Sequence, residues 1–441
     1  MKPRILYPVT FALGLAALSP ACGESPAPEG EPAGPSSTPA VSVDADAGPA
    51  AALAYVPDDS VTGRKIAAAQ QQLRDGPRRI DAHLSLATVL MRRQRETSNA
   101  VLMRYAEDVL ASARALAPAD PQVKLMHAMT LQDGHRFEQA AERAREVLAA
   151  DPDDTTAHLV LADAQLELGD YEGAMDSVQA AMDRRPDLRS YNRAAHLRWL
   201  VGDFDSALAI MELALDAGSS RDPEASAWCY ADLGTMFLHR GDPARAMASA
   251  DRALALVPGY VPGMAVKARA LARQQRAPEA IALLSEVVER RAAVEDLLTL
   301  ASWHEQHGEA EAAAQRRQQA DLLADDDPRP MALDLARRGV QTKRAVKLAE
   351  TALARRANIA AHDAMAMALA RDGQHERARA SMNEAQAMGT ADANLHLHAA
   401  MVHALAGDPV QARAALAIAD GIDAGADLLL RAELEQRLGA A

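Results

Sequence analysis

The chain has 441 residues, of which 49% are hydrophobic but only 3% aromatic, and its formal net charge is −14. This length suffices for two or three globular domains or for one long solenoid. The apolar content lies mainly in Ala, Leu and Met, which favours close helix packing over a sheet. The acidic balance argues against non-specific attraction to nucleic acid or anionic lipid, so we expect no nucleic-acid partner.

The first 22 residues have the three parts of an export signal. Lys2 and Arg4 form a short basic start, an uncharged and mostly apolar run extends from Ile5 to Leu18, and small residues follow. The apolar run is shorter than the roughly 20 residues that a stable transmembrane helix needs. We therefore expect residues 1–22 to be a signal peptide and the protein to be exported.

Residues 18–23 read LSPACG and resemble the lipobox of bacterial lipoproteins, although that family prefers Leu where Ser19 stands. By this resemblance Cys22 would be the lipidated first residue of the mature protein. Gly23 would then direct sorting to the outer membrane, on the side that faces the periplasm. The alternative is cleavage by ordinary signal peptidase, because Ser19 and Ala21 also satisfy the small-x-small rule.

Residues 23–60 are rich in Pro, Ala and Gly, and no basic residue occurs in the chain between Arg4 and Arg64. A segment with so little apolar surface cannot offset the entropy of ordering, so we expect a disordered tether. The segment could be a spacer that holds the folded body away from the membrane, or a low-complexity tail without a function, and the sequence does not decide between them.

The body is organised around a unit of about 34 residues, best seen from Thr155 to Leu188. Apolar residues at helical spacing precede and follow Gly169-Asp170, and Pro186 ends the second helix because it lacks an N–H. One such pair cannot bury its apolar face alone and needs copies on both sides. Candidate copies span about 81–118, 121–152, 155–188, 188–218, 227–258, 261–292, 294–324, 326–357, 359–389 and 393–421, with a capping helix over 426–438.

The array has irregular places. The loop 95–99 is long, surplus residues fall in the Gly/Ser/Pro-rich stretch 217–223, and Asp325–Pro330 marks a break before a shortened helix near Met331. In the capping helix, Arg431, Glu433, Glu435 and Arg437 are expected on the outer, solvated side.

From Asp81 to Ala419 the chain resembles the tetratricopeptide repeat, because small residues recur where the helices of a unit meet. Examples are Ala162 with Ala174, Gly234 with Ala246, and Ala366 with Ala378. The resemblance implies an all-α fold over residues 61–441, a right-handed α-solenoid of about nine helix–turn–helix repeats with capping helices. In this family the first helix of each unit lines a concave groove that binds peptides.

Projecting the groove positions onto this chain gives a set of candidate contacts. They are Gln122, Met129, Asp163, Arg189, Asn192, His196, Trp199, Trp228, Thr235, His239, Arg269 and Arg273. The segments Arg189–Trp199 and Arg269–Arg273 would offer cationic and aromatic contacts to an extended or acidic segment. Alternatively, Trp199 and Trp228 simply pack between neighbouring units. The Lys/Asn pattern by which some members clamp a terminal carboxylate is absent.

Catalytic and metal sites are not predicted, and no cofactor is expected. His304 and His307 lack the four-residue spacing of the zinc-protease helix. His396, His398 and His403 are close in sequence, but residues two apart, such as His396 and His398, point to different helix faces, so we do not expect them to bind a metal together. Cys229 is expected to be a buried small hydrophobe rather than a nucleophile, and lipidation of Cys22 would leave it without a disulfide partner.

Together these features predict a non-enzymatic protein–protein interaction scaffold at the bacterial cell envelope, which binds a protein or peptide segment in its groove. The membrane would be contacted only through the N-terminal lipid, and the oligomeric state is not predicted. The alternative is a structural accessory subunit of an envelope assembly or secretion machine that uses its convex face or its ends. An enzyme is the third and least favoured class.

Overall fold

The computed structural model describes residues 48–439, and every regular element in that range is an α-helix. The signal peptide, Cys22 and most of the expected tether lie outside the described residues. The helices of the first half are α1 (Ala50–Ala54), α2 (Val61–Asp75), α3 (Ile80–Thr97), α4 (Ala100–Leu116), α5 (Pro121–Asp133), α6 (Phe137–Ala150), α7 (Thr155–Glu167), α8 (Tyr171–Arg184), α9 (Leu188–Leu200), α10 (Phe204–Asp216), α11 (Pro223–His239) and α12 (Pro243–Leu256).

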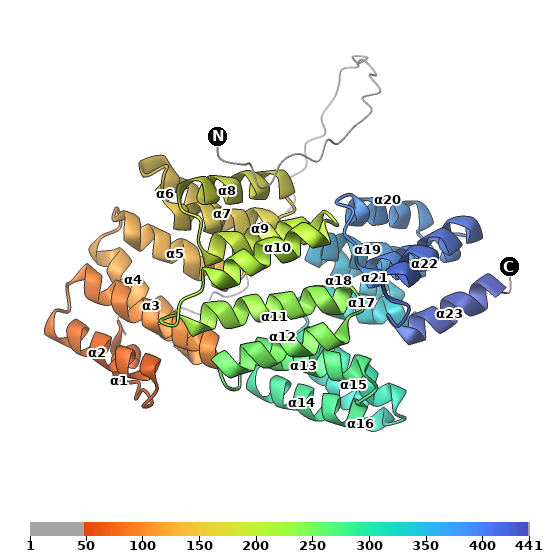
Figure 1. The fold of residues 1–441 in the computed structure, drawn as a ribbon, viewed down its shortest axis with the longest axis horizontal. Coiled ribbons are helices and arrows are strands. Elements are labelled where there is room, and N and C mark those ends of the chain that lie inside the picture. The colour runs from red at the N-terminus through yellow and green to blue at the C-terminus, as the bar shows by residue number, and fades with distance from the viewer. Residues whose placement is uncertain (1–47, 440–441) are drawn as a thin grey trace, which may run out of the picture.

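The second half continues with α13 (Val261–Arg273), α14 (Ala277–Arg290), α15 (Val294–Gln306), α16 (Ala310–Leu322), α17 (Pro328–Arg338), α18 (Thr342–Arg355), α19 (Ile359–Arg371), α20 (His375–Gln386), α21 (Ala393–Leu405), α22 (Pro409–Asp423) and α23 (Leu428–Gly439). From α3–α4 to α21–α22, consecutive helices pack in ten antiparallel pairs, which correspond to the ten candidate ranges in the sequence. The pairs stack into a right-handed α-solenoid, which confirms the predicted fold class (Figure 1).

The turn inside each pair follows from two residue types. A glycine with positive φ ends the first helix in several pairs, as at Gly169, Gly202 and Gly407, because the left-handed conformation has little cost for glycine. An aspartate then caps the second helix, since its carboxylate accepts a backbone N–H that has no helical partner. Asp170 accepts from Gly173, for example, and Asp408 accepts from Gln411.

The small-residue positions form the contact between the paired helices. Ala162 and Ala174 are 2% and 1% exposed, and Ala366 and Ala378 are fully buried. Alanine at these positions allows the helix axes to approach closely, so the core can be filled with few aromatic rings. This arrangement accounts for the low aromatic content of the chain.

The N-terminal end of the solenoid is covered by α1 and α2. Ala52 is buried, and its carbonyl accepts a hydrogen bond of 2.7 Å from the side chain of Gln70 on α2. Residues 50–54 are therefore part of the folded body, although they lie in the range expected to be a tether.

The superhelix turns far enough for its two halves to touch along a line that we call the seam. The Tyr171 hydroxyl accepts from the Ile359 backbone N–H at 2.7 Å, and the Thr390 hydroxyl donates to the Leu200 carbonyl at 2.5 Å. These partners are 188 and 190 residues apart in the chain. Figure 1 shows α9–α11 beside the C-terminal helices along this line.

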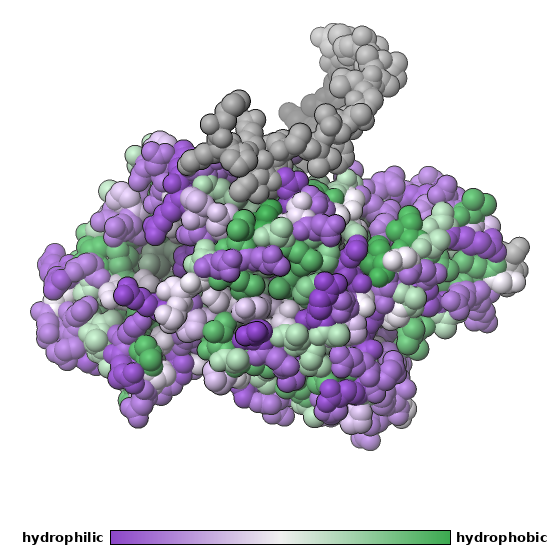
Figure 2. Space-filling model, viewed as in Figure 1, coloured by the Kyte–Doolittle hydropathy of each residue, from purple (hydrophilic) through white to green (hydrophobic). Residues whose placement is uncertain are grey.

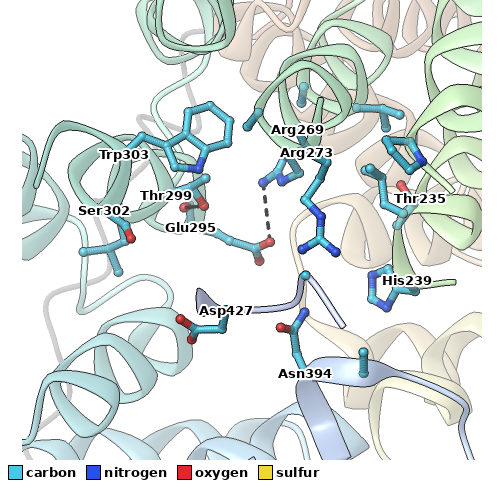
Figure 3. Close-up of a pocket in the computed structure, with 18 of the residues that line it drawn as sticks. Thr235, His239, Arg269, Arg273, Glu295, Thr299, Ser302, Trp303, Asn394 and Asp427 are labelled. Carbon is cyan, nitrogen blue, oxygen red and sulfur yellow. Dashed lines mark hydrogen bonds and ion pairs between the residues drawn. The ribbon is translucent and has the colours of Figure 1, made fainter. Parts of the chain in front are cut away.

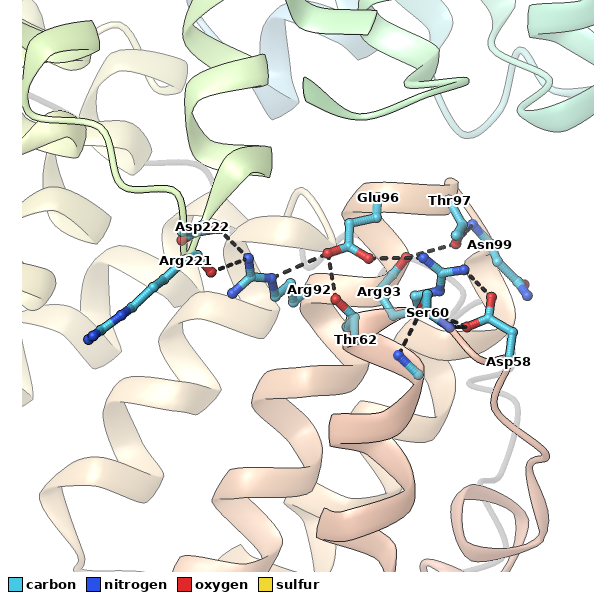
Figure 4. Close-up of polar contacts among 11 residues, drawn as sticks. Asp58, Ser60, Thr62, Arg92, Arg93, Glu96, Thr97, Asn99, Arg221 and Asp222 are labelled. Carbon is cyan, nitrogen blue, oxygen red and sulfur yellow. Dashed lines mark hydrogen bonds and ion pairs between the residues drawn. The ribbon is translucent and has the colours of Figure 1, made fainter. Parts of the chain in front are cut away.

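Two irregular segments meet at a second long-range contact, which we call the clasp (Figure 4). Arg92 on α3 donates to the Arg221 carbonyl at 3.0 Å and pairs with Asp222 at 2.9 Å, both in the loop after α10. Helix α3 also extends to Thr97, into the range 95–99 that was expected to be a loop. The surplus loop 217–223 thus holds the first helical pair against the middle of the solenoid.

The C-terminal helix differs from its predicted orientation. Arg431 is only 9% exposed and ion-pairs with Asp420, and Glu433 accepts two hydrogen bonds from Arg371. The expectation that the Arg431 side chain lies on the outer, solvated side is therefore wrong. Glu433 is half-buried, and Glu435 and Arg437 are exposed as expected. Leu430 and Leu434 pack into the core as expected for a cap.

The described surface is mostly polar. Figure 2 shows hydrophilic atoms over most of one face, with hydrophobic atoms gathered around α9–α10 and near α22. Among residues 48–439, no helix combines the length and the apolar character that crossing a bilayer requires.

Candidate functional site

The solenoid contains a cavity of about 1000 Å³ lined by the first helices of successive pairs, which we call the central cavity. Its walls are the first helices of four consecutive pairs, α11, α13, α15 and α17. The start of α21 and the linker between α22 and α23 complete it (Figure 3). The side chains that shape it include Trp228, Thr235, His239, Val266, Arg269, Arg273, Glu295, Thr299, Trp303, Arg329, Arg337, Asn394, Asp423 and Asp427.

Helical spacing explains why these side chains face the same hollow. On α11, residues Trp228, Asp232, Thr235 and His239 follow one another at intervals of three or four and so lie on one face. The cavity residues of α13 and α15 repeat this pattern one and two pairs later. The concave wall is therefore built from equivalent faces of successive first helices.

The charges that line the central cavity balance. Arg269, Arg273, Arg291, Arg329 and Arg337 stand against Asp232, Glu295, Asp334, Asp423 and Asp427, five of each sign. Arg269 donates to Asp296 at 2.8 Å, Arg329 donates to Glu295 at 2.9 Å, and Arg273 pairs with Asp423. Arg269 and Arg273 were expected to attract an acidic segment, but both are already committed to carboxylates.

Four of the eight principal candidate residues, Trp228, His239, Arg269 and Arg273, line the central cavity, as does Thr235. The Trp228 side chain is 51% exposed there, so it does not simply pack between units. The other four, Arg189, Asn192, His196 and Trp199, lie on α9 and do not line it. Gln122, Met129 and Asp163 belong to α5 and α7 and are also outside it.

Three of the four α9 residues pack against α11 rather than lie open on the surface, whereas Arg189 is exposed. Asn192 is 5% exposed and donates to Asp232 on α11 at 3.0 Å. The Trp199 ring lies between His196 and His239, with ring centroids 5.4 and 5.1 Å away. Trp199 therefore packs between neighbouring units, as the alternative interpretation proposed.

A half-buried ion pair joins α11 to the seam. His239 Nδ1 lies 2.5 Å from a carboxylate oxygen of Asp392, which also caps α21. Burial opposes ionisation of both groups, yet the charge of Asp392 raises the pKa of His239, and the charge of His239 helps to lower the pKa of Asp392 to about 2. Burial likewise opposes the charged form of His196 and His398, but Asp232 and Asp363 raise their pKa values above 6.5.

We predict that the protein loses stability on the alkaline side of neutrality. A histidine with a raised pKa stabilises the fold fully below its unfolded pKa of 6.5, and this contribution is lost as pH rises through the folded pKa. Asp392 has a lowered pKa, so its contribution is present above its unfolded value of 3.8 and is lost as pH falls towards 2. The midpoint temperature of thermal unfolding should therefore decrease as the pH is raised from about 6 to about 9.

The variant His239→Gln tests which group is responsible, because it removes one of the titrating rings. Its midpoint should be lower than that of the wild type at pH 6 and should change less towards alkaline pH. An unchanged alkaline fall in this variant would show that the seam histidine does not cause it.

Sequence projection missed several cavity residues. Glu295, Thr299 and Trp303 occupy on α15 the same face that was projected for α11 and α13, so continuing the projection by one pair would have found them. The sequence did not indicate Asp423 and Asp427. They lie at the end of α22 and just after it, far along the chain from α11 and α13, and only the curvature of the superhelix brings them to the cavity.

The remaining reactive side chains either lie outside the central cavity or are bonded to a neighbouring carboxylate. Cys229 is fully buried, and burial raises the pKa of its thiol to about 12, as expected for a small hydrophobe. His304 Nδ1 lies 2.5 Å from Glu309, and His398 bonds to Asp363. Within residues 48–439, no three His, Cys, Asp or Glu side chains are grouped so that they could hold a metal ion.

Comparison with known proteins supports the repeat architecture. Two family models described as tetratricopeptide repeat match residues 125–188 and 187–258. No curated protein matches the chain.

The similar solved structures share low sequence identity with the chain. A human IFIT1 dimer with PPP-AAAA is 14% identical, with 83% of this chain and 95% of that chain covered at a TM-score of 0.49. The APC/C hetero-tetramer Cut9-Hcn1 is 14% identical, with 89% of this chain and 98% of that chain covered at a TM-score of 0.39. Pseudomonas aeruginosa pilF is 18% identical, with 47% of this chain and 92% of that chain covered at a TM-score of 0.38.

Repeats of this type indicate a protein-interaction scaffold in general. Residues 125–258 are thus similar to tetratricopeptide repeats, and the helical pairs on either side extend the same right-handed α-solenoid.

Proposed function

We propose that the protein is a non-enzymatic interaction scaffold that binds a peptide or protein segment in the central cavity. The observation that carries the proposal is a hollow of about 1000 Å³ into which Trp228 and Trp303 project from α11 and α15. Trp228 is 51% exposed, whereas Trp303 is half-buried against the core. An exposed aromatic ring in a concave site is a typical anchor, because binding removes a large apolar area from water.

The balance of charge narrows the chemistry of the partner. Five arginines paired with nearby carboxylates give little attraction to a polyanion, which disfavours nucleic acid and a strongly acidic segment. We infer a segment of low net charge with one or two apolar or aromatic side chains. Asn394 is exposed in the cavity and is placed to contact the main chain of such a segment.

We predict that Trp228→Ala weakens peptide binding strongly. Peptides selected from a random display library against the full chain should lose about ten-fold or more in affinity, because an aromatic hot spot contributes about 2 kcal/mol or more. Isothermal titration provides the measurement. The matched control is Leu213→Ala on α10, a side chain that is 45% exposed and outside the cavity.

The opposite result would favour the alternative function. If the selected peptides bind Trp228→Ala normally but lose affinity for Leu213→Ala, the convex face is the interaction surface, as in a structural accessory subunit. Charge reversal at Arg269 or Arg273 is a poorer test, because both arginines hold helices together through ion pairs.

We further propose that the scaffold works at the bacterial cell envelope, as an outer-membrane lipoprotein facing the periplasm. The support is the export-signal pattern of residues 1–22 and the LSPACG stretch that ends at Gly23. We predict that Cys22→Ser abolishes membrane fractionation of the exported protein, because the lipid attached at Cys22 would be its only anchor. A Cys22→Ser protein that still sediments with the membranes would contradict lipid anchoring.

A further inference from the structure

The surface formed by the first helices, which we call the inner surface, continues from the central cavity onto α9, because α9 and α11 pack side by side in the same direction (Figure 1). Asn192 on α9 donates to Asp232 on α11 at 3.0 Å, which fixes the register of the two helices. Arg189 lies one turn before Asn192. Trp228 likewise lies one turn before Asp232. The exposed side chains of Arg189 and Trp228 therefore stand level with each other on adjacent helices.

The Arg189 side chain makes no hydrogen bond or ion pair with any residue between 48 and 439. Of two arginines that lie near it, Arg193 donates to both carboxylate oxygens of Asp163. The other, Arg95, pairs with Glu224 at 3.2 Å. A ligand can therefore bind to the Arg189 guanidinium without breaking a contact that the structure shows.

The electrostatic surroundings of Arg189 are unfavourable in the free protein. Partial withdrawal from water, followed by the positive charges of Arg193 and Arg95, lowers the pKa of Arg189. The charges of Asp222 and Asp187 oppose this effect, but the lowering prevails. An exposed side chain that is also partly dehydrated lies in a hollow of the surface, where a ligand can enclose it. A carboxylate at this position would give Arg189 the partner that it lacks.

A charge of the opposite sign stands farther along the inner surface, at the end of α5. Asp133 is exposed and makes no hydrogen bond or ion pair with any other described residue. Partial withdrawal from water raises the pKa of Asp133, although the charge of Arg95 opposes this. The charges of Asp163 on α7 and Glu224 on α11 also act on Asp133, so it faces the other first helices. A basic group at this position would neutralise the carboxylate.

We propose that the bound segment extends from the central cavity past Trp228 along α9 to α5, and that it pairs an acidic side chain with Arg189 and a basic side chain with Asp133. This inference rests on the proposed function, because Trp228 would anchor an apolar side chain of the same segment. Two opposite charges leave the segment with the low net charge that the balanced charges of the central cavity favour.

The spacing of the helices sets the spacing of these side chains in the segment. Packed helices lie about 8–10 Å apart, and an extended chain advances about 3.3 Å per residue. The acidic residue should therefore stand about three positions from the apolar anchor, with the basic residue beyond it. The carboxylate should belong to Asp or Glu inside the segment, since a segment that ended at Arg189 would leave Asp133 without its partner.

Peptide selection against variants of the full chain tests this charge pattern. A random display library with constant flanking residues is selected in parallel against the wild type and Arg189→Glu. The wild-type pool should contain Asp or Glu about three positions from an apolar residue, and the variant pool should lack this preference. The matched control is Arg252→Glu, which makes the same change at an exposed arginine on α12 outside the central cavity. Its pool should resemble that of the wild type.

Isothermal titration of the selected peptides measures each pairing directly. Replacing the acidic residue of a peptide by its amide should weaken binding to the wild type about ten-fold, but should have little effect on binding to Arg189→Gln. The basic residue of the peptide should depend on Asp133 in the same way, as measured with Asp133→Asn. Neither variant removes a side-chain contact from the free protein, so both should unfold at the temperature of the wild type. Peptides with a free and an amidated C-terminus should bind equally.

Failure of this inference is distinguishable from failure of the proposed function. If binding depends on Trp228 but the wild-type and Arg189→Glu pools are alike, the charge pairing is wrong and the binding function of the cavity stands. If Arg252→Glu changes its pool as Arg189→Glu does, net charge rather than contact is responsible, which also overturns the pairing. A strict need for a free C-terminus would overturn the internal carboxylate. If no peptide is enriched, or binding does not depend on Trp228, both proposals fail.

Discussion

Replacing Gly169 and Gly202 together by alanine is expected to separate the two halves of the solenoid along the seam. Both glycines have positive φ, of 83° and 76°. A Cβ at Gly169 would collide with the Ala357 carbonyl oxygen, and one at Gly202 would lie 2.6 Å from the Gly389 carbonyl oxygen. Since backbone atoms cannot move aside cheaply, the adjoining turns must part. Small-angle scattering should show a larger radius of gyration.

The chain supplies a matched control for this variant. Gly373 and Gly407 occupy the same turn of later pairs with φ of 80° and 75°, but an added Cβ there would meet nothing within 4 Å. Alanine at these two positions therefore introduces the same backbone strain, about 1–2 kcal/mol each, without the collision. This control should lower stability while leaving the radius of gyration unchanged. An equal expansion in both variants would mean that strain, not contact across the seam, is responsible.

The second large effect is expected for Glu224→Ala at the base of the clasp. Glu224 is 5% exposed, accepts a hydrogen bond of 2.9 Å from the Tyr260 hydroxyl and pairs with Arg95 at 3.2 Å. Burial, followed by the charge of Glu224, raises the pKa of Tyr260, so its hydroxyl stays protonated as a donor. Removing the carboxylate leaves the fully buried Tyr260 hydroxyl without its acceptor and the half-buried Arg95 guanidinium without this ion-pair partner. The loss should be about 3 kcal/mol or more.

Chemical denaturation followed by circular dichroism measures this loss. Arg221→Ala is the control, because only the backbone carbonyl of this exposed residue takes part in the clasp. It should change the free energy of unfolding by less than about 0.5 kcal/mol. A small effect of Glu224→Ala, similar to that of the control, would show that the contacts of Glu224 with Tyr260 and Arg95 do not stabilise the solenoid.

The fold was predictable because its signals are local. A 34-residue spacing, Gly-Asp turns and alanines at the contact of paired helices each act within one unit, and a unit recurs ten times. Helix ends were less certain where the turn is unusual. The end of α3 is an example, because Ser98 rather than a glycine takes the left-handed conformation there.

The candidate site was only partly predictable because its chemistry is not local. From the sequence, Arg269 and Arg273 look like free cations on one helix. Their carboxylate partners, Asp296 and Asp423, come from α15 and from the end of α22. Arg431 was expected in solvent for the same reason, since the tilt of the last helix depends on side chains far away in the chain. Small rotations between successive pairs add up over half the solenoid, and no local pattern records their sum.

The seam also changes how this chain should fold. In an open repeat array each unit interacts only with its neighbours, so folding can start anywhere and the ends can melt independently. Here Tyr171 and Leu200 contact residues 188 and 190 positions later in the chain. Such distant contacts require the intervening pairs to be in place first, which raises contact order and slows folding. Unfolding of the middle and the C-terminal half should accordingly be more cooperative than in an open array of the same length.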